Sequence, residues 1–169
     1  DLYYAGNGVP RDFAKAYDLY RRAAEAGSQT AKSQMGEMLV KGEGVAPDIG
    51  KGLSLIAGVA EAGSATAYVR IGDLYNEGEA VAMQPAKAIR AYTKAAELGS
   101  ASALLKLGDI YSSGRFGGRR LKEARAFYEK AAAAGDPYGL FALGRNLAVD
   151  SPQGSKAAAR GFPLLQKCE

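Results

Sequence analysis

The stretch Ala23–Ser28, "AAEAGS", decides the fold because the chain repeats it at a fixed interval. Variants of the same phrase end at Ser64, Ser100 and Asp136: "VAEAGS", "AAELGS" and "AAAAGD". Successive copies are 36 residues apart. A short phrase that returns with a constant period is typical of stacked helical repeats, in which each unit packs only on its neighbours.

The residues around each repeated glycine predict helix boundaries. A glycine can adopt the left-handed backbone that ends a helix, and a serine or aspartate directly after it can cap the next helix. These predicted pairs are Gly27–Ser28, Gly63–Ser64, Gly99–Ser100 and Gly135–Asp136. A second set of glycines is predicted to end the first helix of each unit: Gly6, Gly42, Gly78 and Gly114. Further predicted starts are Asp12 and Asp48 as N-caps and Pro85 and Pro137 as first helical residues.

A glycine also recurs inside the first helix of each unit, at Gly36, Gly72, Gly108 and Gly144. A glycine in a helix interior costs about 1 kcal/mol relative to alanine. Four glycines at the same repeat position each carry this cost, so a contact at that position must compensate for it. We therefore expect the second helix of each unit to approach closely at this position.

These features predict an all-α fold: a right-handed α/α superhelix of about four helix pairs with a 36-residue period. We expect one solenoid over residues 1–169, with units at about 1–27, 28–63, 64–99, 100–135 and 136–169, the first and last of them partial. The repeat departs from its pattern at "RFGGRR" after Gly114, in the loop "AVDSPQGS" expected after Leu147, and in the shifted last segment "KAAARGFPLLQKCE". Because the chain begins inside a repeat and without Met, we expect it to be a piece of a longer protein.

Composition excludes several function classes. The net charge of +4 is spread over scattered Lys and Arg residues among 18 acids, which argues against a nucleic-acid binder. There is no histidine and one cysteine, Cys168, so the sequence predicts no catalytic triad, metal site or cofactor. No apolar run is long enough to predict a transmembrane segment.

The pattern "A…LG.LY..G.GV..D..KA...Y.KAAE.G" resembles the Sel-one-like repeat (SLR), a relative of the tetratricopeptide repeat. It is carried by Ala67, Ile71, Gly72, Leu74, Tyr75, Gly78, Ala88, Tyr92, Lys94, Ala95, Ala96 and Gly99. The resemblance implies a scaffold that binds other proteins and performs no chemistry. Some bacterial relatives serve exopolysaccharide production, envelope sensing or host contact, which favours a periplasmic or exported location over a cytoplasmic one. A cysteine-rich branch of the family staples each repeat with a disulfide, and this chain lacks those cysteines.

The resemblance further implies that first helices line a concave binding face. Its candidate residues are Glu37, Val69, Arg70, Asp73, Asn76, Leu105, Lys106, Asp109, Tyr138, Phe141 and Arg145, and Ser33 and Val40 are expected on the same open side. A row of carboxylates that Arg145 interrupts could bind a basic peptide: Asp1, Glu37, Asp73 and Asp109. Alternatively, it is a solvated face supported by pairs within one helix, such as Arg70 with Asp73. The apolar residues could form a groove for an amphipathic partner, or could pack against the next repeat.

A basic loop patch is the second candidate site: Arg115, Arg119, Arg120, Lys122 and Arg125. It could contact an acidic protein surface, an anionic polysaccharide or lipid headgroups, or it could be a hydrated loop.

The expected function is a protein-interaction scaffold that binds a partner protein or peptide on the concave face. The alternative is a bacterial envelope scaffold that contacts an anionic polysaccharide or an exopolysaccharide-secretion partner. A glycan-processing enzyme ranks last, because the acids recur with the repeat whereas a catalytic pair would be a single special site.

Overall fold

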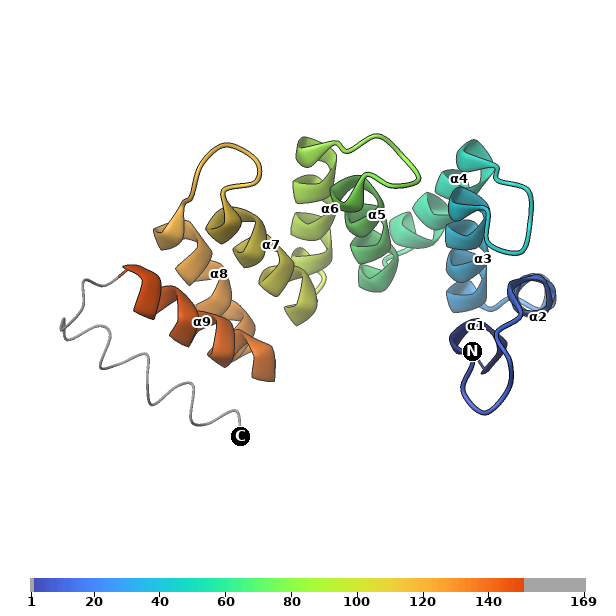
Figure 1. Cartoon of the computed structure of the whole chain (residues 1–169), viewed down its shortest axis with the longest axis horizontal. Coiled ribbons are helices and arrows are strands. Elements are labelled where there is room, and N and C mark those ends of the chain that lie inside the picture. Colours follow the sequence, from blue (N-terminus) through green and yellow to red (C-terminus); the bar gives the residue numbers. More distant parts are fainter. Residues whose placement is uncertain (1, 151–169) are drawn as a thin grey trace. The chain divides into compact units, whose positions relative to one another are not determined.

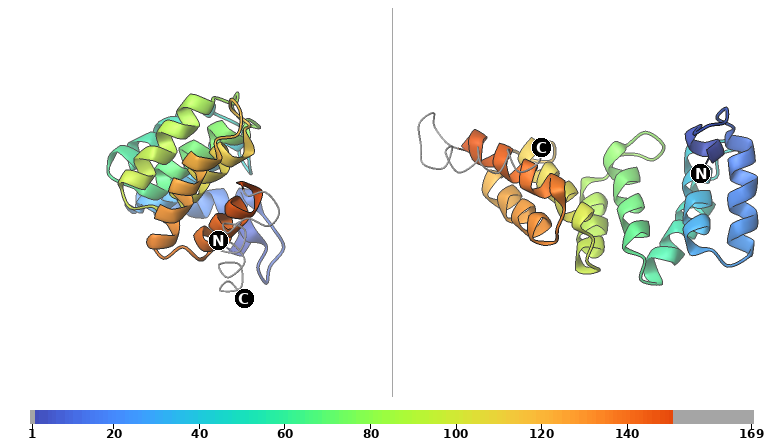
Figure 2. Two further views of the ribbon diagram at one scale, coloured as in Figure 1. Left: turned by 90° about the vertical axis from the view of Figure 1, so that its left-hand side faces the viewer. Right: turned by 90° about the horizontal axis from the view of Figure 1, so that it is seen from below.

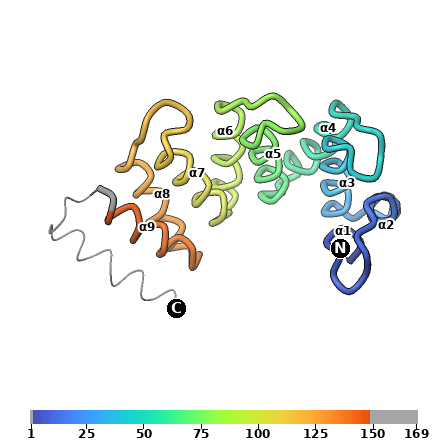
Figure 3. The backbone as a smooth tube through the Cα atoms, viewed as in Figure 1, coloured from blue at the N-terminus to red at the C-terminus, as the bar shows by residue number. Residues whose placement is uncertain are grey.

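The computed structural model describes residues 2–150, and side chains up to residue 148. This part of the chain is all helical, with no strand. Its helices are α1 (Leu2–Ala5), α2 (Phe13–Glu25), α3 (Gln29–Lys41), α4 (Ile49–Glu61), α5 (Ala65–Glu77), α6 (Pro85–Glu97), α7 (Ala101–Ser113), α8 (Leu121–Ala133) and α9 (Pro137–Asp150). Tight turns follow α2, α4, α6 and α8, whereas wider loops follow α3, α5 and α7 (Figure 1, Figure 3).

The chain forms two compact units, Asp1–Ala91 and Tyr92–Glu169. In the first unit each helix from α1 to α4 packs on the next one along the chain. In the second unit α8 packs on both α7 and α9 (Figure 2). From α1 to α5 and from α7 to α9, helices that are neighbours in sequence are therefore neighbours in space, as the repeat predicts.

The predicted helix boundaries are confirmed. The hydroxyl oxygens of Ser28, Ser64 and Ser100 accept hydrogen bonds from the backbone N–H three residues later, at 3.2–3.3 Å. Asp136 also caps α9: its Oδ1 accepts from the N–H of Tyr138 at 2.8 Å and from the N–H of Gly139, three residues later, at 3.3 Å. The φ angles of the four turn glycines, Gly27, Gly63, Gly99 and Gly135, lie between 83° and 98°, in the left-handed region that favours glycine.

The close approach expected at the interior glycines is present in both units. A Cβ atom on Gly36 would lie 2.8 Å from the backbone oxygen of Gly52 and 2.8 Å from the Ile56 side chain, both on α4. A Cβ atom on Gly108 would overlap the Tyr128 ring on α8. The side chains of Ile56 and Tyr128 are buried against these glycines.

Two expectations about helix faces and ends are wrong. Ser33 and Val40, expected on the open side of α3, are buried, and Val40 packs in a cluster with Ile56 on α4 and Leu74 on α5. The stacking of the next repeat covers that side of α3. The loop expected after Leu147 also starts later, because α9 continues to Asp150. Asp150 occupies the register of the helix-ending glycines, so the left-handed stop is missing there. The segment "KAAARGFPLLQKCE" and Cys168 lie outside the described residues.

The glycine contact between α3 and α4 gives a stability prediction. We expect Gly36→Ala to lower the free energy of unfolding by about 1–3 kcal/mol, because the added methyl group meets backbone and a buried isoleucine. Gly58→Ala on α4 is the matched control, since nothing lies within 4 Å of a Cβ atom there. It should instead raise stability by up to about 1 kcal/mol through helix propensity. Urea unfolding followed by circular dichroism measures both, and equal effects of the two substitutions would contradict the contact.

Candidate partner-binding face

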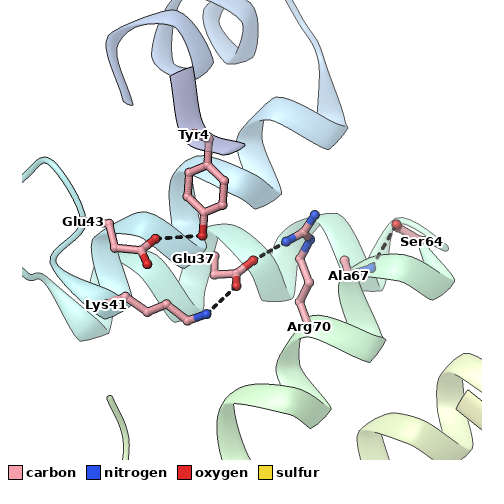
Figure 4. Close-up of polar contacts among 7 residues, drawn as sticks. All are labelled: Tyr4, Glu37, Lys41, Glu43, Ser64, Ala67 and Arg70. Carbon is pink, nitrogen blue, oxygen red and sulfur yellow. Dashed lines mark hydrogen bonds and ion pairs between the residues drawn. The ribbon is translucent and has the colours of Figure 1, made fainter. Parts of the chain in front are cut away.

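The candidate face residues of the first unit form an ion-pair network rather than an open row of acids. Glu37 on α3 lies between two cations: Arg70 of the next repeat forms a hydrogen-bonded ion pair with it, and Lys41 of its own helix donates to it at 2.8 Å (Figure 4). The side chains of Glu37 and Arg70 are only 15% and 23% exposed. Through this contact Arg70 joins consecutive repeats.

Tyr4 and Glu43 extend the polar contacts at this end of the first unit. The Tyr4 hydroxyl donates to Oε2 of Glu43 at 2.9 Å (Figure 4). Burial and this hydrogen bond raise the pKa of Tyr4 to about 12. The pKa of Lys41 is also raised: burial lowers it, but the hydrogen bond to Glu37 and the nearby negative charges together outweigh that effect. The charges near α3 are thus engaged with one another.

The carboxylate row is similarly engaged in the second unit. Asp109 on α7 accepts a hydrogen bond from the hydroxyl of buried Tyr128 at 2.8 Å, and that hydroxyl lies 3.0 Å from the Ser112 hydroxyl. Lys106 lies over the Tyr92 ring, 5.9 Å from its centroid. Asp1 lies outside the described residues. The acidic side chains of α3 and α7 therefore do not form a continuous strip that is available to a basic peptide.

The candidate apolar residues divide into packed and exposed ones. Leu105 packs against the buried cluster of Ala124, Tyr128 and Ala142, so it belongs to the contact between repeats. Tyr138 and Phe141 on α9 are 69% and 41% exposed. The guanidinium of Arg145, one turn further along α9, lies 5.7 Å from the Phe141 ring centroid. We call Tyr138, Phe141 and Arg145 the α9 stripe. Of the remaining candidates, Val69, Asp73 and Asn76 on α5 are partly buried.

The predicted basic patch is only partly a loop. Arg115, Arg119 and Arg120 lie exposed between α7 and α8, where Arg115 stacks on Phe116 and Arg120 on Tyr111. Lys122 and Arg125 are instead residues of α8, and Arg125 is partly buried. The correction follows from Leu121, the first residue of α8, which starts the helix directly after the arginine pair.

A polar pocket of about 440 Å³, which the sequence analysis missed, lies among α7, α8 and α9. Its polar lining includes Asp109, Ser112, Arg119, Tyr128, Arg145 and Asn146. Burial raises the pKa of Tyr128 to about 12; the hydrogen bond with Ser112 opposes this shift and the one to Asp109 adds to it. The sequence did hold a signal for Asn146, because the equivalent positions in the other repeats are Met38, Leu74 and Ile110.

No helix among the described residues is long and apolar enough to cross a membrane. Within the same residues there is no cluster of three or more side chains that could bind a metal ion.

Comparison with known proteins places this architecture. The Sel1 repeat model matches residues 1–28, 30–56, 65–100 and 101–136, which is most of the chain. The chain belongs to the Sel1 repeat family. Sel1 repeat proteins generally act as protein-interaction scaffolds.

Two solved structures are similar to this chain over nearly its whole length. A protective antigen of uropathogenic Escherichia coli strains with an SLR fold is 30% identical, with a TM-score of 0.71. It covers 98% of this chain, whereas this chain spans only 36% of that protein. A Sel1 repeat protein from Oxalobacter formigenes is 29% identical with a TM-score of 0.70, over 99% of this chain and 70% of its own. No curated protein matches significantly. The predicted all-α solenoid class and the SLR resemblance are confirmed.

The Glu37–Arg70 contact between Sel1 repeats gives a second prediction. Arg70→Met keeps the apolar stem of the side chain and removes its charge, which leaves the mostly buried Glu37 with one cation fewer. We expect the free energy of unfolding to fall by about 1–3 kcal/mol. Arg21→Met is the control: Arg21 pairs with Asp18 and Glu25 on the exposed surface of α2, and its loss should barely move the urea midpoint. Equal midpoints for the two variants would contradict a structural role for Arg70.

The raised pKa values of Tyr4 and Tyr128 predict the alkaline limit of stability. Both phenols favour their neutral form in the folded chain, so their stabilising effect is complete below pH 10, the ordinary value, and is lost as the pH rises toward about 12. The urea midpoint should fall across that window. It should fall less in Tyr4→Phe and Tyr128→Phe, which have no phenol to ionise. A midpoint that stays constant through the window in the unmodified chain would contradict the shifts.

Proposed function

We propose that this Sel1 repeat chain is a single solenoid, without enzymatic activity, that binds a partner protein or peptide on the face formed by its first helices, with the α9 stripe as the main contact. The observation that carries the proposal is the exposure of two aromatic rings and an arginine on one side of α9. Tyrosine and arginine are among the residues that contribute most to protein–protein binding energy. Two aromatic side chains left exposed on one side of a helix are typical of an interaction site.

The packing of the helices explains why such a face suits binding. The first helices α3, α5, α7 and α9 are each fixed by a serine or aspartate cap and by packing on a neighbouring second helix, α4 or α8, so their exposed side chains are held in place before a partner arrives. Little backbone order then has to be gained on binding, which reduces the entropic cost of association. The remaining face candidates, Val69, Arg70, Asp73, Asn76, Leu105 and Lys106, would shape and support this surface.

A matched pair of surface variants tests the role of the α9 stripe. We expect Phe141→Ser, alone or with Tyr138→Ser, to abolish capture of the partner identified by mass spectrometry. Leu19→Ser on α2 should retain it, because Leu19 is 43% exposed but lies on a second helix. Circular dichroism confirms that all variants are folded, and isothermal titration measures the loss with the purified partner. If Phe141→Ser still captures the partner and Leu19→Ser does not, the binding site lies on the second helices instead.

A second candidate function is contact with an anionic polysaccharide in a bacterial envelope, which the exposed arginines between α7 and α8 favour. Under that function, Arg115→Glu with Arg120→Glu should abolish binding to polygalacturonate, and added salt should weaken it in the unmodified chain. The same double variant should leave partner binding by the α9 stripe intact. Partner binding that follows the loop arginines and ignores Phe141 would favour this second candidate.

A further inference from the structure

From the pocket among α7, α8 and α9 we infer that the partner presents an acidic peptide segment, whose carboxylate enters beside Arg119 and Arg145 and whose main-chain amide pairs with Asn146. This site rests on the proposed function and names the chemistry of its partner. The pocket is about 440 Å³, within the range of ligand sites but toward its small end, which suits a short piece of extended chain.

Comparison of equivalent repeat positions shows what is unusual here. Between α3, α4 and α5, the residues Val40, Ile56 and Leu74 are at most 3% exposed and form an apolar core. Seventy-two residues later, the same register holds Ser112, Tyr128 and Asn146. The intervening repeat already holds Asn76 and Tyr92 at the registers of Ser112 and Tyr128, so Asn146 is the residue that departs from every equivalent position, Met38, Leu74 and Ile110.

The ion pair between repeats changes in the same place. Glu37 corresponds to Asp109, and Arg70, which contacts Glu37, corresponds to Ala142. Ala142 is too short to reach Asp109 or to fill the space that an arginine would occupy. The methyl side chain of Ala142 lines the pocket, which therefore lies where the first unit has a long cation.

Asn146 is the group that points to a ligand. Its side chain is 4% exposed and lines the pocket, yet neither Oδ1 nor Nδ2 has a hydrogen-bond partner within the described part of the chain. A buried amide without hydrogen-bond partners destabilises the folded chain. A ligand that satisfies both atoms must offer a donor and an acceptor side by side, and the peptide unit of an extended chain does so.

The charge of the pocket favours an anionic group. Arg119 and Arg145 supply two positive charges, whereas Asp109 supplies one negative charge and already accepts from Tyr128. Arginine binds carboxylates through paired N–H donors, and such charge-assisted hydrogen bonds are the strong ones. Because Arg145 also belongs to the α9 stripe, an apolar residue next to the acid would meet Phe141.

The chain itself provides two variants that should close the site and keep the fold. Ala142→Arg introduces the arginine that α5 carries at the equivalent position, Arg70. At position 142 its side chain can reach Asp109 and fill the pocket. Asn146→Leu restores the leucine of position 74 and removes the unsatisfied amide. We expect both to abolish peptide binding, and Asn146→Leu to unfold at a higher temperature than the unmodified chain.

The direct test uses the full chain labelled with ¹⁵N and an acetylated, amidated hexapeptide that contains one glutamate next to one phenylalanine. We expect saturable chemical-shift changes at the Asn146 side-chain amide. Binding should weaken by at least about tenfold when glutamine replaces the glutamate, because a charge-assisted contact is lost. A hexapeptide with a free terminal carboxylate and no glutamate shows whether the terminal group serves equally well. Lys130→Ala, on the exposed surface of α8, is the control that should bind normally.

The outcomes separate this site from the proposed function. The acidic-peptide site is overturned if no peptide shifts the Asn146 amide, or if Ala142→Arg and Asn146→Leu bind the peptide as well as the unmodified chain. It is also overturned if oligogalacturonate shifts that amide in preference to the peptides, since the ligand would then be a uronate polymer. If Ala142→Arg and Asn146→Leu keep the captured partner while Phe141→Ser loses it, the proposed function stands and the acidic-peptide site fails.

Discussion

The contact on which this fold depends is the close approach of two helices at an interior glycine, seen in the α3–α4 and α7–α8 hairpins. Gly36 lies against the backbone of Gly52, and Gly108 lies against the ring of Tyr128. Such contacts leave no room for a side chain, and they fix the register of one helix on the other. Once that register is fixed, the apolar residues on the outer side of each hairpin lie where the next repeat can cover them. A hairpin that exposed this side would lose the burial that stabilises it.

A fixed register makes repeats comparable position by position, and this comparison separates structural from functional residues. Glu37 and Arg70 show how two repeats join through a mostly buried ion pair beside an apolar core. Asp109 and Ala142 occupy the same positions in the second unit, but the cation is gone and the neighbouring core is polar. Because packing alone would favour the first arrangement, the second needs another explanation, and recognition of a ligand provides one.

The fold could be predicted from the sequence because its signals are local and repeated. The caps at Ser28 and Asp136 need only the residues that follow them in the chain, and the tight contact at Gly36 follows from the cost of glycine within a helix. The exposed and buried faces of the helices were harder to predict, because Val40 is covered partly by side chains of the next repeat and not only by its own hairpin. The predicted end of α9 was too early, because α9 continues to Asp150. Asp150 stands where equivalent helices have the glycine that ends them.

The candidate site was predictable only in part, since it depends on which side chains reach across between repeats. A helical wheel identified Phe141 and Arg145, and Tyr138 was named as their neighbour; all three are exposed on α9. The role of Arg70 could not be identified in this way, since its partner Glu37 lies 33 residues away on another helix. Asn146 lies between these cases: its polarity stands out against Met38, Leu74 and Ile110, but its missing hydrogen bonds are visible only once α7 and α8 are packed around it. In a repeat protein, a polar residue in an apolar register is therefore the first place to look for a ligand, because the other repeats show what packing alone would have placed there.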